Sequence, residues 1–238
     1  MHITPDTIIF FQWHGLRLNA TIVCTWIVMG ILLTVSLIAT RKLSSGPRVS
    51  RWQTIMETVV LTIRSEIRNT MQMDPAPFLP FLGTLFLFIS ISNLLAVVPV
   101  YRPPTGSIST TAALATTVLL TAPVYGISKQ GVLGFLKTYL HPIPIMLPLN
   151  ILSDISRAIA LSVRLFGNIM SGHLIAAIMI GIIPLIFPLV LDAIELLLGQ
   201  IQAYIFTVLS SVILAAAVRP GETDRDNVTL NAEGGTHG

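Results

Sequence analysis

"LSVRLFGNIMSGHLIAAIMIGIIPLIFPLVLDAIELLLGQIQ", residues 161–202, is the segment from which the architecture of this chain can be worked out. It is almost continuously apolar, yet it carries Arg164, whose guanidinium keeps its proton at ordinary pH. Pro184 and Pro188 mark a turn between two apolar arms of about 32 residues each. A helix of that length measures about 48 Å, whereas the hydrocarbon core of a bilayer is about 30 Å thick. The segment therefore predicts a long helical hairpin that lies steeply tilted in a membrane.

The composition of the whole chain also indicates a membrane protein. Of its 238 residues, 53% are hydrophobic and 11% are charged, whereas soluble domains carry about 25% charged residues. Uncharged runs of about 18 residues or more are typical of transmembrane helices. The net charge of +3 does not indicate nucleic acid, because the cations gather beside the apolar segments. We expect an all-α polytopic membrane protein with one domain and without cofactor or metal, and the single Cys24 allows no internal disulfide.

The apolar blocks and the cations together predict the order of the helices and their orientation. The expected elements are an upright helix over 21–40, an amphipathic helix over 50–72, a hairpin of helices over 78–100 and 107–128, the two tilted helices over 147–181 and 187–218, and a polar tail over 219–238. The first helix has no small-residue cleavage pattern, so we expect it to be retained. Cytoplasmic loops are enriched in cations, which places the N-terminus outside and the C-terminus in the cytoplasm. The loops assigned to the inside carry Arg41, Lys42, Arg48, Arg51, Lys129 and Lys137, and the external loop carries only Arg102.

The segment over 50–72 has the pattern of an amphipathic helix. Most of its apolar residues fall on one face at helical spacing, and Leu61 is the one misfit. We expect the helix to lie flat on the cytoplasmic surface of the membrane, and the alternative is an ordinary globular helix. The residues of the apolar face are Trp52, Ile55, Met56, Val59, Val60, Ile63 and Ile67.

Polar residues inside the tilted hairpin are expected to form two layers. Arg164 and Gln202 lie at equal distances from position 183, and His173 and Glu195 from position 184, so each pair should lie at one depth. Asn168 lies one turn from Arg164. A histidine and a buried glutamate can take up and release protons, whereas an arginine is a fixed positive charge. We therefore expect a proton-relay layer and an arginine layer that blocks a direct leak.

Less specific explanations exist for several of these groups. Charges inside a membrane are costly and usually functional, and Arg164 is too deep in its helix to reach water easily. Arg157 is nearer a helix end and could extend to the interface, and Asp154 could be a group at the helix end. The His173–Glu195 pair could be purely structural. Gln202, with the serines and threonines of the helix over 107–128, could simply join helices.

The sequence resembles subunit a of F-type ATP synthases over most of residues 19–217. The motifs that carry the resemblance are "LSVRLFGNIMSGHLI" and "QIQAYIFTVLSSVIL" in the tilted hairpin, with "SNLLAVVP", "PPTGSISTTAALA" and "LNATIVCTWIVM" before it. The resemblance implies a membrane stator beside a rotating c-ring, with two ion half-channels that meet the ring at different places. It also implies b subunits of the peripheral stalk as partners, and no catalytic site in this chain.

The resemblance also assigns roles to individual residues. It makes Arg164 the arginine that pairs transiently with the ring carboxylate, with Asn168 and Gln202 at that interface and Tyr204 nearby. His173 and Glu195 match the paired inlet positions, Asn93 matches an external-side asparagine, and Asp192 is a further acid of the hairpin that we include among the ion-translocation residues. Some relatives have acids where this chain has Ala96 and Ser107, which leaves the inlet route and the coupling ion, proton or sodium, open.

Two other classes of function remain alternatives at this point. A secondary transporter would use the hairpin's polar groups as a substrate site, but it would predict internal repeats, which the sequence lacks. A purely structural membrane anchor would leave Arg164 unexplained. No phosphate-cradling glycine motif is present, so we expect no ATP site. We favour the stator subunit, located in a bacterial plasma membrane.

Overall fold

A computed structural model describes residues 9–13, 16–41, 51–98, 101–140, 146–181 and 187–218 of the chain. The polar tail expected over 219–238 lies outside these residues. The described fold is dominated by helices, as the sequence predicts, and a two-stranded hairpin is added near the N-terminus. The elements are β1 Ile9–Trp13, β2 Leu16–Asn19, α1 Ala20–Arg41, α2 Arg51–Met71, α3 Leu79–Leu94, the 3-10 turns η2 Leu95–Val97 and η3 Pro104–Gly106, α4 Ile108–Leu140, α5 Met146–Ile180 and α6 Phe187–Val218.

Within the described residues, α1, α3, α4, α5 and α6 are long and apolar enough to cross a membrane. Burial separates them sharply: 61% of the apolar window of α6 is buried inside the protein, against 11% of that of α1. The fully covered Phe206 and Leu214 of α6 belong to the shared core. Helix α6 is therefore the central helix of the fold, whereas α1 presents apolar side chains outward, as a helix facing lipid does.

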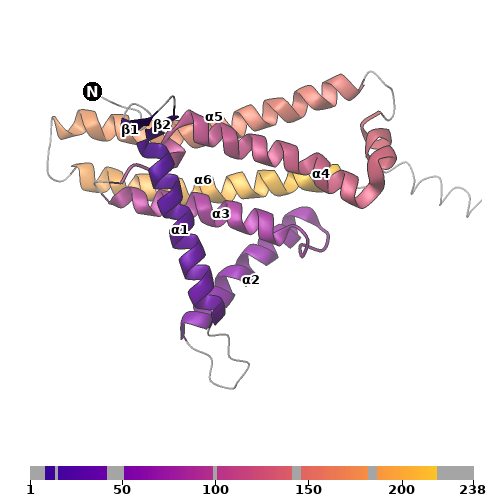
Figure 1. Ribbon diagram of the computed structural model, residues 1–238, viewed down its shortest axis with the longest axis horizontal. Coiled ribbons are helices and arrows are strands. Elements are labelled where there is room, and N and C mark those ends of the chain that lie inside the picture. The colour runs from indigo at the N-terminus through magenta and orange to yellow at the C-terminus, as the bar shows by residue number, and fades with distance from the viewer. Residues whose placement is uncertain are drawn as a thin grey trace, which may run out of the picture.

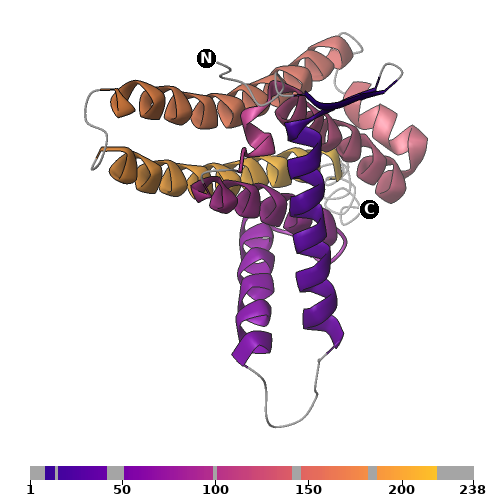
Figure 2. The ribbon, with the colours of Figure 1, turned by 60° about the vertical axis from the view of Figure 1, so that its left-hand side comes forward.

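The hairpin of α5 and α6 lies at a steep angle to α1. The two helices run side by side along the long axis of the molecule, while α1 crosses their direction in both views (Figures 1 and 2). Helix α4 packs against α5 and α6, and α3 packs against α6. With α1 upright in a bilayer, the hairpin would be strongly tilted, which is the arrangement expected from its length.

Helix α2 packs against α3 and α6 through the second half of its apolar face. Ile63, Ile67 and Met71 are buried there, whereas Ile55 and Val60 at the other end remain exposed. In Figure 1, α2 begins near the lower end of α1 and runs back toward α3 at a wide angle to α1. The helix is thus amphipathic, with one half of its apolar face in the core and the other half exposed.

The helical hairpin of α3 and α4 differs from its expected bounds at two ends. Helix α3 ends at Leu94 and continues only as the turn η2, because Pro99 disfavours helical backbone in the residue before it, and Val98 is already extended. Helix α4 does not end at 128, and the loop expected around Lys129 and Lys137 is wrong: the chain is helical to Leu140. Gly131 breaks it there with φ 74°, a conformation that glycine adopts without steric cost.

The N-terminal hairpin pairs β1 and β2 in antiparallel register, with Phe11 opposite Leu18 and Trp13 opposite Leu16. No helix or strand was expected before the helix over 21–40. Bulky aromatic and aliphatic residues favour extended backbone, and "IFFQW" carries that signal. The hairpin leads directly into α1, so it lies at the same end of α1 in both views (Figures 1 and 2).

Candidate functional site

His173 of α5 and Glu195 of α6 face each other across the hairpin. The Nε2 atom of His173 lies 3.6 Å from Oε1 of Glu195, as the equal spacing from the turn predicts. That separation is too long for a hydrogen bond, but it allows an ion pair when the imidazole is protonated. The side chain of Glu195 is only 12% exposed, and its Oε1 atom is buried without a hydrogen-bond partner among the described residues. A buried acceptor that lacks a protein partner is a place where a water molecule can donate a hydrogen bond.

The carboxylate of Glu195 rests directly on the backbone of α5 at Gly172. A Cβ atom added at Gly172 would lie 2.5 Å from Cδ and 2.6 Å from Oε2 of Glu195. No ordinary non-bonded contact is that short, so a side chain at Gly172 would displace the carboxylate. The close approach of His173 and Glu195 therefore requires a glycine at position 172.

We expect Gly172→Ala to destabilise the protein and to move Glu195 away from His173. Overpacking of this kind typically costs about 1–3 kcal/mol. The matched control is Gly167→Ala on the same helix, where an added Cβ meets nothing within 4 Å and alanine improves helix propensity by about 1 kcal/mol. Thermal unfolding of the purified complexes in detergent checks this. Equal melting temperatures for the two variants would contradict the contact.

Asn93 at the end of α3 ties together three parts of the chain. Its Nδ2 atom donates a hydrogen bond to the Gly199 carbonyl of α6 at 2.7 Å, and its Oδ1 atom accepts one from Thr105 Oγ1 at 3.1 Å. Asn93 is 2% exposed, and a Cβ at Gly199 would lie 3.0 Å from the Asn93 Cβ. The amide thus fixes α3 and the η3 turn against α6, one helical turn from Glu195.

A small cavity links this amide to the acids of the hairpin. It measures about 10 Å³, room for about one water molecule, and is bounded by α3, α5 and α6. The structure thus brings Asn93, Asp192, Glu195 and His173 into one cluster. Ala96 also lines the cavity, so position 96 contributes no carboxylate to it. Ser107 lies between η3 and α4 and is fully buried. The polar lining residues are Asn93, Asp192 and Glu195.

Replacing Asn93 by alanine is expected to destabilise the fold by about 1–3 kcal/mol. The buried Gly199 carbonyl would lose its side-chain donor and Thr105 its acceptor, and an unsatisfied buried group costs that much. Thr117→Ala is the matched control, because the exposed Thr117 hydroxyl donates its hydrogen bond to Ala113 of its own helix. Melting temperatures of the two purified variants measure the difference. A loss for Asn93→Ala no larger than that for Thr117→Ala would show that the amide does not fix these elements.

Arg164 lies on the outer side of α5. Its neighbours Leu161 and Leu165 are buried in the core, whereas Arg164 is exposed, together with Arg157 and Ser171 at intervals of two turns. Arg157 pairs with Asp154 at 3.7 Å. Among the residues that the structure describes, the Arg164 guanidinium has no ion pair with a carboxylate. The positively charged side chain of Arg164 therefore points away from the core of the protein.

The expected arginine layer shows fewer contacts between its members than the His173–Glu195 layer. Gln202 is 6% exposed, and its Nε2 atom is buried without a hydrogen-bond partner, as is the Nδ2 atom of Asn168, within the described residues. No hydrogen bond joins Arg164 to Gln202 in that part of the chain. The two amides thus offer unused donors in the hairpin interior, and their pairing with Arg164 stays a prediction.

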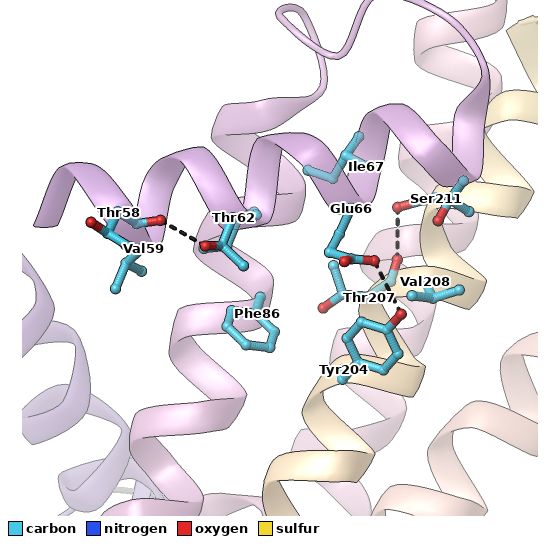
Figure 3. Close-up of a pocket in the computed structure, with 12 residues that line it drawn as sticks. Thr58, Val59, Thr62, Glu66, Ile67, Phe86, Tyr204, Thr207, Val208 and Ser211 are labelled. Carbon is cyan, nitrogen blue, oxygen red and sulfur yellow. Dashed lines mark hydrogen bonds between the residues drawn. The ribbon is translucent and has the colours of Figure 1, made fainter. Parts of the chain in front are cut away.

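Tyr204 lies on a different side of α6 from these groups. Its hydroxyl donates to Oε2 of Glu66 on α2 at 3.1 Å (Figure 3). The structure therefore does not bring Tyr204 to the His173–Glu195 cluster, and its link to Glu66 was not foreseen from the sequence. Glu66 falls on the amphipathic helix, where a single acid carries no distinctive signal.

Other polar contacts were also missed by sequence reasoning. Ser90 and Gln200 exchange hydrogen bonds between α3 and α6, and Ser162 donates to Thr111 between α5 and α4 at 3.2 Å. Pairs of hydroxyls and amides recur throughout such helices, so only the fold could show which of them meet.

Tyr101, between α3 and η3, is a titratable residue that does not belong to the cluster of Asn93, Asp192, His173 and Glu195. Burial raises the pKa of Tyr101 to about 12, and the nearby Ser92 hydroxyl offsets part of that rise. Its phenol therefore stays protonated at all physiological pH values. It can pack and donate a hydrogen bond there, but it cannot relay protons by ionising.

The fold and the site together define a polytopic helical membrane protein with ionisable groups between its long helices and an exposed arginine that forms no ion pair within the described part of the chain. The family model described as "ATP synthase A chain" matches residues 22–215. A protein named "ATP synthase subunit a 2" from Acaryochloris marina is 50% identical over 233 residues, with 98% of each chain covered. "ATP synthase subunit a" from Albidiferax ferrireducens is 53% identical over 219 residues, covering 92% of this chain and 95% of that protein. This chain belongs to the ATP synthase A chain family, and it is a stator subunit of the ion-translocating Fo sector.

Proposed function

We propose that this chain couples ion flow to rotation by presenting Arg164 to a c-ring and by leading ions to the ring through two half-channels. The observation that carries the proposal is the position of Arg164. It is exposed on an apolar helix, and it has no ion pair within the described residues. A lone guanidinium in a bilayer needs a partner, and a carboxylate on a neighbouring rotor would supply one transiently.

The cluster of Asn93, Asp192, His173 and Glu195 supports the external half-channel. Each of these groups can accept or hand on a proton or hold a water molecule, and the cavity lined by Asn93, Asp192 and Glu195 has room for one water molecule. With the N-terminus outside, the ends of α3 and α6 that carry this cluster face the exterior. An ion arriving there would pass along α6 toward Gln202, whose buried Nε2 donor is unused among the described residues.

The energetics of the bilayer explain why rotation would follow. A ring carboxylate that enters lipid must be neutral, because an ionised acid there costs several kcal/mol. Opposite Arg164 it can ionise and release its ion, and it can be reloaded only from the other half-channel. The membrane potential supplies about 2.3 kcal/mol per charge for each 100 mV. Arg164, Asn168 and Gln202 would thus separate the two half-channels.

The surroundings of the subunit follow from the same assignment. We place the N-terminus outside and the C-terminus in the cytoplasm of a bacterial plasma membrane, with the c-ring and the b subunits of the peripheral stalk as partners. The relatives named above come from bacteria. The exposed apolar surface of α1, including Trp26 and Leu33, is suited to lipid or to another membrane subunit.

Isolation of the intact complex tests this assignment. A c-ring should co-purify with the chain, and vesicles that contain the complex should pump ions when ATP is added. Pumping that requires sodium and survives an uncoupler would identify sodium as the coupling ion, and pumping abolished by the uncoupler without need for sodium would identify protons. Ion transport by this chain alone, without a ring, would refute the stator role.

A further inference from the structure

A pocket between the amphipathic helix and the core lies on another side of α6 from the cluster of Asn93, Asp192, His173 and Glu195. Its volume is about 320 Å³, at the small end of the range for ligand sites. Helix α2 forms one side, α6 the other, and Phe86 of α3 the base between them (Figure 3). The pocket shares no lining residue with the small cavity at Glu195.

The walls of this pocket are apolar although they contain several hydroxyl groups. Thr62 donates to the carbonyl of Thr58 at 2.8 Å, and Ser211 donates to that of Thr207 at 2.8 Å. Each hydroxyl proton is thereby turned back to its own helix. These threonine and serine side chains therefore present mainly methyl and methylene groups to the pocket. A polar ligand would find few donors there, whereas a hydrocarbon chain would be well accommodated.

One charged side chain, Glu66, lines the pocket. Its Oε2 atom accepts the hydrogen bond from Tyr204, and the two side chains point toward one another across the pocket (Figure 3). The second carboxylate oxygen remains able to accept a hydrogen bond from a ligand. The cations Arg64 and Arg68 stand two residues away on either side, which places them on a different face of α2. The charge that a ligand meets in this pocket is therefore negative.

The surface around the pocket is apolar, as expected of a surface in contact with lipid. Val60 and Leu61 of α2 and Ile201 of α6 are exposed apolar side chains near its lining residues. A ligand would therefore arrive from the bilayer. An apolar pocket with a single carboxylate complements a molecule with a hydrocarbon chain and a positively charged hydrogen-bond donor.

We propose that the pocket holds a bilayer phospholipid with an ammonium headgroup, its acyl chain between α2 and α6 and its ammonium group on Glu66. Charge-assisted hydrogen bonds between an ammonium donor and a carboxylate are stronger than neutral ones. An anionic lipid would bring a net negative charge to the same carboxylate, with no ammonium group to offset the repulsion. This lipid would fill the space between α2 and α6, and the site does not depend on the role of Arg164.

Photoactivatable lipids test the proposal in the intact complex. Phosphatidylethanolamine and phosphatidylglycerol probes with the same diazirine-bearing acyl chain are reconstituted with the complex, and labelled peptides are identified by mass spectrometry. We expect the phosphatidylethanolamine probe to label α2 and α6 peptides at least about threefold more than the phosphatidylglycerol probe, the scale of a partly exposed ion pair. Glu66→Gln should reduce that ratio to about one, because it removes the charge and keeps an acceptor for Tyr204.

Matched variants separate this site from general contact with lipid. Glu57→Gln removes an exposed acid from the opposite face of α2 and should leave the ratio unchanged. Thr62→Trp fills the pocket and should abolish labelling by both probes while Glu66 remains. Should Glu66→Gln fail to assemble, Glu66→Asp, which keeps the charge, and Thr62→Trp decide the question. Equal labelling by the two probes in the unmodified complex, or labelling that persists in Thr62→Trp, would overturn the proposal.

Discussion

ATP-driven ion pumping is expected to disappear when Arg164 is replaced by alanine. The exposed guanidinium is the fixed positive charge that the ring carboxylate would meet, and an alanine leaves that carboxylate no partner when it ionises. Arg164→Lys keeps a charge but loses the planar, multiply donating geometry, so we expect it to restore little of the activity. Pumping is measured in inverted membrane vesicles, with the amount of assembled complex determined alongside.

Arg157→Ala is the matched control for this experiment. Arg157 lies seven residues earlier on the same side of α5, is exposed, and pairs with Asp154. Exposed pairs of this kind contribute about 0–1 kcal/mol, so its removal should leave assembly and pumping largely intact. Normal pumping by Arg164→Ala would refute the role of the arginine. Equal losses for both variants would mean that positive charge on this face matters, and not Arg164 in particular.

The sequence predicted the parts of this fold that depend on long-range hydrophobicity. The two arms of the hairpin exceed the thickness of a bilayer, and their helices α5 and α6 run over 146–180 and 187–218 in the structure. The pairing of His173 with Glu195 followed from their equal distance to the turn. Both inferences use a single strong constraint, either apolar length or antiparallel geometry, which leaves few alternatives.

Features that depend on single side chains in three dimensions were not predictable in this way. Nothing in the sequence shows that Gly131 permits α4 to break and continue to Leu140. The placement of Tyr204 against Glu66 depends on how α2 docks on α6, which helical periodicity alone does not determine. The hydrogen bonds of Asn93 likewise depend on two residues that periodicity does not identify. Gly199 lies 106 residues along the chain, and Thr105 lies in the η3 turn. Periodicity indicates which face of a helix is buried, but it does not identify the opposing residue.

Exchanging His173 and Glu195 is expected to preserve more pumping than removing either group. The two side chains lie 3.6 Å apart, one on each helix of the hairpin, so the exchange keeps one acid and one imidazole at the same depth. Each single removal, His173→Ala or Glu195→Ala, leaves one ionisable group without its partner and interrupts the route for protons. We expect the double exchange to pump less than the unmodified complex, because an imidazole is bulkier than a carboxylate and Glu195 already rests on Gly172.

The decisive comparison is between the double exchange and the weaker of the two single variants. A relay needs only that a proton can pass between two groups, so its chemistry survives a change in which helix carries which group. A purely structural pair depends on the shape of each side chain in its own place, so the exchange would be as harmful as either removal. Exchanging Arg157 with Asp154, the pair at 3.7 Å on the surface of α5, controls for the effect of moving charges in the hairpin and should cost little pumping. A double exchange of His173 and Glu195 that is as inactive as the worse single variant, in fully assembled complexes, would therefore reject the relay and leave the pair a structural role.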